Sequence, residues 1–228
     1  MELKIDQELL DLFTELRASI IHIRGVKVEK RSSDLEDFKE LIIKEVKDKY
    51  DIKSLKDVPV FKAYRKFFWK VGIDPTKIRP AAEALIRRIL GGKSVPNINT
   101  AVDSYNLASI KSEIALAAFD RDQLRGNLRM RFARKGERFL GIGMVEPKEL
   151  QGGEIVVSDQ LNLVAIYPYR DVGETKITEK TKNVLLMVCG VPGISKEDLV
   201  NAADIATEYI IKFCNGIKSV IDNGITTS

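Results

Sequence analysis

The sequence predicts an α+β fold in which central antiparallel or mixed β-sheets are flanked by helices. Apolar side chains recur with a helical period of about 3.6 residues through most of residues 1–112. The period changes to about two, which is typical of strands, from residue 114, and helical spacing returns after residue 194. Helices, then a run of short strands, then a closing helix indicate an α+β domain rather than alternating βαβ units.

The N-terminal part begins with a predicted amphipathic helix over residues 6–18, whose apolar side chains share one face. A short strand with apolar side chains follows at residues 21–28. Ser33 and Glu36 have the spacing of a capping box, which predicts that the next helix opens there and runs to about Lys49.

Three further helices are predicted before the strands. The first has Pro59 in its opening turn and an aromatic stripe over residues 61–69, which we expect to lie in the core because its spacing is helical. The second covers residues 79–91 and ends at a glycine. Thr100 is the predicted cap of the third, where Asp103 can reach back to the free backbone amides.

The second half of the chain contains the strands and the closing helix. The predicted strands cover residues 127–133, 154–159, 163–169 and 183–188. The helix that follows is predicted to be capped by Ser195 and Asp198 and closed by Asn215 and Gly216.

Composition excludes several classes of protein. The 37 Lys and Arg residues exceed the 33 Asp and Glu residues so slightly that net charge alone does not indicate an RNA binder. No apolar run approaches the roughly 18–20 residues that cross a bilayer, and the first residues lack the features of a signal peptide. We therefore expect a cytoplasmic protein with no membrane partner.

Common catalytic motifs are absent from the sequence. It contains no GxGxxG, GxxxxGK[ST], HExxH or GxSxG, which argues against dinucleotide, P-loop, zincin and hydrolase-elbow chemistry. The single histidine, His22, lies between two isoleucines of a predicted strand, so a His-based nucleophile or triad is not expected. Cys189 and Cys214 are predicted to be buried apolar residues, and we expect no metal or cofactor.

Two groups of polar side chains lie within otherwise apolar helices. Arg79, Glu83 and Arg87 are spaced (i, i+4), so they form either intrahelical ion pairs or contacts to a substrate. Asp103 and Asn106 lie one turn apart and share a face. They either converge on a pocket or, in the case of Asp103, serve as a helix cap.

The second group belongs to a longer motif. In PNINTAVDSYNLASIKSEIALAAFD, an Ile-Asn step is followed by Val-Asp, two residues, an Asn and an Ala-Phe-Asp ending. These positions are Ile98, Asn99, Val102, Asp103, Asn106, Ala118, Phe119 and Asp120, with Gly136, Glu137, Thr181 and Asn183 downstream. Over roughly residues 60–215 their order and spacing resemble the B3/B4 editing domain of the beta subunit of bacterial phenylalanyl-tRNA synthetase.

This resemblance implies the B3/B4 architecture and an editing activity. Domains of that family hydrolyse the ester of a tRNA that carries the wrong amino acid, typically tyrosine on the phenylalanine tRNA. Hydrolysis is needed because an apolar pocket cannot strongly reject a substrate that only adds a hydroxyl. This sequence departs from the family at Ala117, where the family has a histidine, and at its Gly-Gly-Glu segment. Tyrosine specificity is therefore not carried over.

The predicted site is a pocket without metal. In place of the Gly-Gly-Glu segment stand Tyr169, Arg170, Asp171 and Thr175. Arg170 is expected to hold a carbonyl or phosphate oxygen, and Asp159 or Asp171 to position the attacking water. The substrate-binding residues are expected to be Arg79, Glu83, Asp103, Asn106, Asp120, Ser158 and Thr175.

Basic residues cluster around the first predicted strand pair. RNA binding is predicted at Arg125, Arg129, Arg131 and Arg134, where cations could contact the phosphates of an acceptor stem. The alternative is a solvated sheet face without a role in binding.

The leading hypothesis is a free-standing hydrolase that deacylates a mischarged tRNA, with tRNA or aminoacyl-tRNA as its partner. The alternative is a module that binds tRNA, an amino acid or another protein without catalysis, and a third hypothesis is a small-molecule enzyme on the same scaffold. Residues 1–55 are expected to form an extension packed on a B3/B4-like domain of residues 56–228, in one compact unit. The amino acid, the tRNA and the oligomeric state stay open.

Overall fold

The computed structural model describes residues 1–222 and confirms the α+β class. The helices are α1 Gln7–Leu12, α2 Ser33–Lys49, α3 Pro59–Lys70, α4 Ala81–Leu90, α5 Thr100–Ser112 and α6 Lys196–Cys214, with short 3₁₀ turns at Leu55–Asp57 and Arg121–Gln123. The strands are β1 Leu3–Ile5, β2 Ala18–Arg24, β3 Ala115–Asp120, β4 Leu128–Phe132, β5 Arg138–Phe139, β6 Lys148–Glu149, β7 Ile155–Ser158, β8 Leu163–Ile166, β9 Arg170–Asp171, β10 Asn183–Cys189 and β11 Ile217–Asp222.

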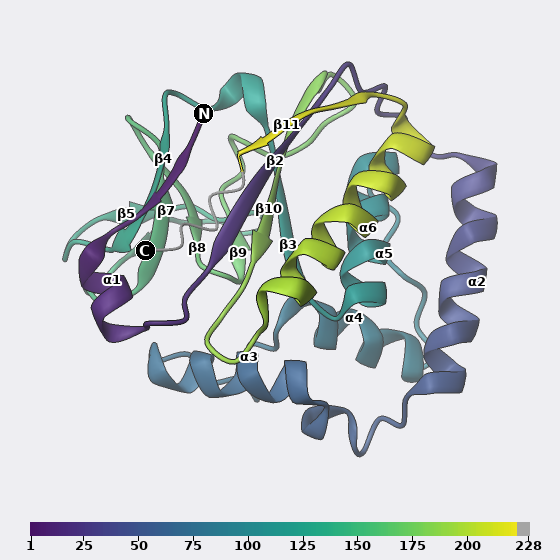
Figure 1. Cartoon of the computed structure of the whole chain (residues 1–228), viewed down its shortest axis with the longest axis horizontal. Coiled ribbons are helices and arrows are strands. Elements are labelled where there is room, and N and C mark those ends of the chain that lie inside the picture. Colours follow the sequence, from purple (N-terminus) through teal and green to yellow (C-terminus); the bar gives the residue numbers. More distant parts are fainter. Residues whose placement is uncertain (223–228) are drawn as a thin grey trace.

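Two main sheets and a layer of helices make up the body of the molecule (Figure 1). The five-stranded sheet has the order β1-β4-β7-β8-β9, in which only the β1–β4 pair is parallel. The four-stranded sheet has the order β11-β2-β10-β3 and is antiparallel throughout. It lies between the five-stranded sheet and the helices α5 and α6, and α2 packs outside α5 (Figure 1).

The sequence of strand β10 accounts for the central position of the four-stranded sheet. Its sequence NVLLMVC is a continuous apolar run rather than an alternating one, as expected for a strand that is covered on both faces. Every residue of β10 after Asn183 is buried. Side chains of both sheets, such as Met130 of β4 and Leu185 of β10, belong to one buried cluster.

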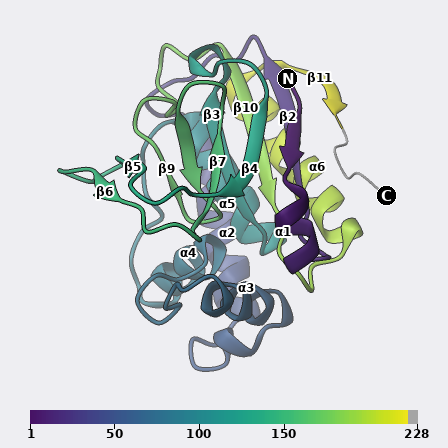
Figure 2. The same ribbon diagram turned by 90° about the vertical axis from the view of Figure 1, so that its left-hand side faces the viewer.

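Helices α3 and α4 lie below the sheets, and the small β5–β6 sheet projects to one side (Figure 2). The aromatic stripe of α3 is in the core as predicted, with Phe61, Tyr64 and Phe67 buried, but Trp69 is 58% exposed. The Tyr64 hydroxyl donates to the carbonyl of Cys189 and accepts from the amide of Ala115 at 3.0 Å. Helix α3 is thereby tied to two strands of the central sheet.

The N-terminal elements differ from the prediction. The first helix ends at Leu12 rather than continuing to residue 18, and the strand that follows is Ala18–Arg24. Residues 18–24 pair with all seven residues of β10, so this strand begins and ends earlier than the strand predicted over residues 21–28. Residues 1–55 supply β1 to the five-stranded sheet and β2 to the four-stranded sheet.

Helix caps differ in two places. Helix α2 has Ser32 as its N-cap without a side-chain cap bond, so the capping box expected at Ser33 and Glu36 is wrong. Helix α5 is capped by Asn99, whose side chain accepts from the amide of Val102 at 2.9 Å, rather than by Thr100. Within residues 1–222, no helix combines the length and apolar character that a membrane crossing requires.

Candidate functional site: a cavity between the two sheets

A small cavity lies where the two main sheets meet the start of α4 and the middle of α5. Its volume is about 180 Å³. Its lining comes from both sheets and both helices and consists of Ala81, Tyr105, Asn106, Leu116, Ala117, Ala165, Ile166, Tyr167, Pro168, Tyr169, Arg170, Asp171, Met187 and Cys189. Its walls are largely apolar, and its polar side chains are few, a composition common in small-molecule sites.

Asp171 is the acidic side chain of this cavity. It is half-buried, and among residues 1–222 no group donates a hydrogen bond to its carboxylate. Burial raises the pKa of Asp171 to about 7, against the opposing effect of the neighbouring Arg170 guanidinium. A carboxyl group with a pKa near neutral can both accept and donate a proton at physiological pH.

The other polar groups of the cavity are potential donors. Burial, followed by the charges of Asp171 and Asp103, raises the pKa of Tyr105, so its hydroxyl stays protonated. The Asn106 side chain carries an amide donor and a carbonyl acceptor. Arg170 donates from Nη1 to the carbonyl of Ile142 at 3.0 Å, which leaves its other guanidinium hydrogens available.

The position of Arg170 depends on Gly141. A Cβ at position 141 would lie 2.5 Å from Cδ of Arg170, closer than real atoms approach. Residue 141 also forms an isolated antiparallel bridge with Val172, so the loop after β5 is held against β9. Any larger residue at position 141 would push Arg170 away from its present place.

Three of the predicted site residues, Asn106, Arg170 and Asp171, line this cavity. Glu83 and Asp103 do not, because cations of the fold hold them elsewhere. Glu83 is fully buried and pairs with Arg87 at 2.7 Å and Arg65 at 3.2 Å, in agreement with the ion-pair interpretation of that helix. The Arg79–Glu83 pair is not among the ion pairs of the described residues, and Arg79 lies in a separate surface groove.

Asp103 forms a buried ion pair that the sequence analysis missed. It lies 2.7 Å from Nζ of Lys39 and accepts from the amide of Ile98 at 3.0 Å. Both side chains are 4% exposed, so the pair stabilises the α2–α5 contact only because each charge has its partner. Lys39 lies on the buried face of α2 with Leu35 and Ile42. A lysine at a helical position otherwise occupied by apolar residues indicates that its charge is paired with a buried acidic group.

Asp120, Asp159, Ser158 and Thr175 are also outside the cavity lining. Asp120 accepts from the Thr181 hydroxyl at 2.7 Å. Asp159 accepts from three backbone amides, those of Arg125, Leu161 and Asn162, and so shapes the loop after β7. Ser158 is buried beside it, and the buried Thr175 hydroxyl has no hydrogen-bond partner among residues 1–222.

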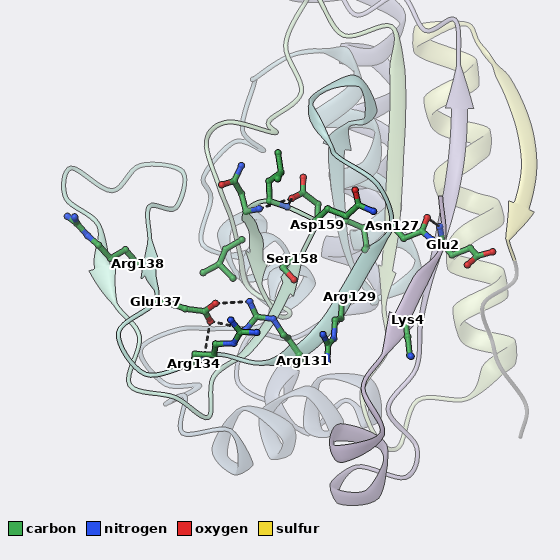
Figure 3. A pocket seen from close by; sticks show the side chains of 15 residues that line it. Glu2, Lys4, Asn127, Arg129, Arg131, Arg134, Glu137, Arg138, Ser158 and Asp159 are labelled. Atoms are coloured by element: carbon green, nitrogen blue, oxygen red, sulfur yellow. Dashed lines mark hydrogen bonds and ion pairs between the residues drawn. The ribbon is translucent and has the colours of Figure 1, made fainter.

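A larger, shallower groove lies on the outer face of the five-stranded sheet (Figure 3). Of the residues predicted to bind RNA, Arg129, Arg131 and Arg134 line it and Arg125 does not. Two of these guanidinium groups are paired within the chain. Arg129 makes two bonds to Asp6, at 2.7 and 2.9 Å, and Arg131 makes two to Glu137, at 2.7 and 2.9 Å. The Arg131 bonds, opposed by burial, lower the pKa of Glu137.

Comparison with known proteins places the cavity within a segment that matches a family model. A family model described as "B3/4 domain" matches residues 63–215, which include every residue that lines the cavity. The chain belongs to the B3/4 domain family. The match begins inside α3 and ends just after α6.

Curated relatives of this B3/4 domain protein are much longer than the chain. It is 33% identical over 91 residues to the phenylalanine–tRNA ligase beta subunit of Fusobacterium nucleatum, which is 40% of this chain and 11% of that protein. It is 25% identical over 185 residues to the same subunit of Photorhabdus laumondii, or 81% of this chain and 23% of that protein.

A solved structure also resembles the chain. It is an N-terminal fragment of the phenylalanyl-tRNA synthetase beta subunit from Pyrococcus horikoshii, with a TM-score of 0.49 and 14% identity. The likeness covers 93% of this chain and 48% of that one.

Proposed function

We propose that this B3/4 domain protein is a trans-acting aminoacyl-tRNA deacylase, in which the cavity between the sheets receives the amino-acid end of a mischarged tRNA. The observation that carries the proposal is the Asp171 carboxylate. It faces a cavity built within the matched family range, has a pKa near 7 and receives no hydrogen bond from the described residues. A tRNA substrate is in keeping with the phenylalanine–tRNA ligase relatives and with the cytosol as the proposed compartment.

The size of the cavity is compatible with an amino-acid side chain. An apolar protein cavity of about 150 Å³ holds a benzene molecule, and the cavity here measures about 180 Å³. Tyr105, Tyr169 and Met187 would surround the side chain of the substrate, and Asn106 would donate to its carbonyl. The amino acid itself is not assigned, because this cavity contains neither the histidine nor the glutamate of the resembled domain.

In the proposed reaction, a water molecule attacks the ester carbonyl while its proton passes to the Asp171 carboxylate. Arg170 and the Asn106 amide stabilise the negative charge that forms on the carbonyl oxygen. The bond to the ribose oxygen then breaks, and that oxygen takes the proton from Asp171. The products are the free amino acid and deacylated tRNA, and Asp171 returns to its starting state.

The test is loss of the ester from a panel of mischarged tRNAs, measured against spontaneous hydrolysis. Asp171→Asn should slow the enzymatic rate by roughly 10²–10⁴-fold, as expected for loss of a general base. Asp48→Asn, which removes the same charge from the exposed face of α2, should leave it unchanged. The wild-type rate should rise with pH up to about 7. Equal rates for Asp171→Asn and wild type would remove Asp171 from the mechanism.

A non-catalytic binding module is the second candidate, and Ala117 favours it. This methyl group lines the cavity at the position where the resembled domain has a histidine. Binding of aminoacyl-tRNA without faster ester loss, for every amino acid in the panel, would support this candidate over the deacylase.

A further inference from the structure

A second groove lies on the exposed side of α4, and most of its lining residues are cations. Its volume is about 420 Å³, and its lining consists of Lys77, Arg79, Ala84, Arg87, Arg88, Gly91 and Lys93. Two of its lining residues, Ala84 and Gly91, have little or no side chain, and the other five are cations. No acidic residue of the described chain lines it.

The cations of this groove share its lining with no acidic residue of the described chain, unlike those on the sheet. Arg79 and Lys93 are exposed and form no ion pair within residues 1–222, and Lys77 is 4.0 Å from Asp74. The groove on the five-stranded sheet, by contrast, is also lined by Glu2, Glu137 and Asp159. An anion bound to Arg129 or Arg131 in the sheet groove would have to displace a carboxylate, whereas Arg79 and Lys93 at α4 have no carboxylate partner to displace among the described residues, although Arg87 pairs with Glu83.

Helix stabilisation accounts for only part of this cluster. Arg87 and Arg88 lie in the last turn of α4, where positive charge offsets the partial negative charge of the free carbonyls. Arg88 also donates from Nε to the carbonyl of Ser94 at 2.5 Å. Lys77 and Arg79 precede the helix, and Lys93 follows it, so neither role applies to these three residues.

Helix α4 connects this groove to the cavity. Ala81 lines the cavity, and Ala84 and Arg88 line the groove. Residues spaced i, i+3 and i+7 share one face of a helix, and seven residues extend about 10 Å along its axis. Arg79 precedes Ala81 by two residues and Ala84 follows it by one turn, so the cationic groove lies close to the cavity along the chain.

We propose that the α4 groove binds the phosphate groups of an RNA strand whose acylated end enters the cavity. This inference rests on the proposed function for the identity of the RNA. It also assigns the phosphate contacts to Lys77, Arg79 and Lys93. The sequence analysis had instead predicted these contacts at the arginines of the five-stranded sheet. Each phosphate so neutralised releases counterions, so binding must weaken as salt concentration rises.

The test measures equilibrium binding of uncharged tRNA by fluorescence anisotropy at several salt concentrations. The double variant Arg79→Gln/Lys93→Gln should bind about tenfold more weakly, and its slope of log K against log salt should be smaller by roughly 1.4–1.8. Lys44→Gln/Lys47→Gln removes two exposed charges from α2 and should bind as wild type does. All four positions are exposed, so the variants should fold.

Three results would overturn the inference. Equal losses in the α4 and α2 variants would indicate a general charge effect. A loss confined to Arg134→Gln/Arg138→Gln would place the phosphates in the sheet groove. Stoichiometric binding of inorganic pyrophosphate at α4, with tRNA affinity unchanged in Arg79→Gln/Lys93→Gln, would indicate a small-anion site. Because uncharged tRNA is the probe, these results do not depend on hydrolysis, and the deacylase proposal can fail while the groove is upheld.

Discussion

The buried and half-buried carboxylates of this protein differ in what their oxygens contact. Asp103 has Lys39 at 2.7 Å, and Asp159 accepts from three backbone amides. Asp171 faces the cavity with no such donor among the described residues. Carboxylates of one fold acquire different roles through their surroundings. The first two stabilise the structure, and the third is available to a ligand.

The raised pKa of Asp171 predicts how the stability of the protein depends on pH. The folded value is about 7 and the ordinary value 3.8, so the folded state binds more protons between these two values. The contribution of Asp171 to the free energy of unfolding is fully present below about pH 4 and is lost as pH rises through 7. Asp171→Asn should therefore be about 1–2 kcal/mol more stable than wild type at pH 8, after allowance for solvent in the cavity, and this difference should shrink as pH falls until the two are nearly equal at about pH 4.

Urea denaturation at the two pH values measures this difference. Asp48→Asn is the matched control, because its carboxyl group is exposed and its removal should not change the pH dependence. A constant difference between Asp171→Asn and wild type from pH 5 to pH 8 would show that Asp171 ionises normally in the folded protein.

The site could be predicted from sequence only where local spacing decides it. The motif around Asn106 and the replaced segment at Arg170 and Asp171 identified three residues that do line the cavity. The ion pair of Asp103 with Lys39 joins residues 64 positions apart, and no local pattern specifies which distant side chain meets which. Asp159 was expected at the site and lies outside the cavity lining, and a loop aspartate that accepts backbone bonds looks the same in sequence as one that faces a ligand.

At the scale of elements, the two serine N-caps provide a direct comparison. Ser195 of α6 and Asp198 form a complete capping box, in which the Ser195 hydroxyl accepts from the Asp198 amide at 3.0 Å. Ser32 occupies the same position in α2 but makes no side-chain cap bond. Ser195→Ala should lower the free energy of unfolding by roughly 0.5–2 kcal/mol, because an amide of the first turn loses its acceptor.

Ser32→Ala is the control, and its effect on the urea midpoint should be no more than a few tenths of a kcal/mol, since it removes no cap bond. Similar losses in both variants would mean that the hydroxyl of Ser195 contributes by another route. The sequence pattern of Ser followed by an acid three residues later occurs at both helices, at Ser33 and Ser195, and only the second pair closes. Patterns of this kind locate a helix start, whereas the bond itself depends on the direction from which the chain enters the helix.

At the scale of the whole molecule, the N-terminal segment ties the two sheets together. Strand β1 is an edge strand of the five-stranded sheet and pairs only with β4. Strand β2 is internal to the four-stranded sheet, between β11 and β10. The sequence predicted a strand near β2 but not β1, and it predicted neither partner, because pairing between residues 18–24 and 183–189 is set by packing across the whole chain.

Deletion of residues 1–55 tests whether the remaining B3/4-like segment is an independent domain. The deletion removes β2, and with it the buried Ile20, Ile21 and Ile23, so one edge of β10 loses its partner and the core loses a layer of side chains. We expect the fragment 56–228 to lose its cooperative urea transition and near-ultraviolet circular dichroism. Deletion of residues 1–5 removes only the edge strand β1 and should leave a cooperative transition at lower urea concentration. A fragment 56–228 that unfolds cooperatively would instead establish the boundary near residue 55, and would show that β10 can close the central sheet without β2.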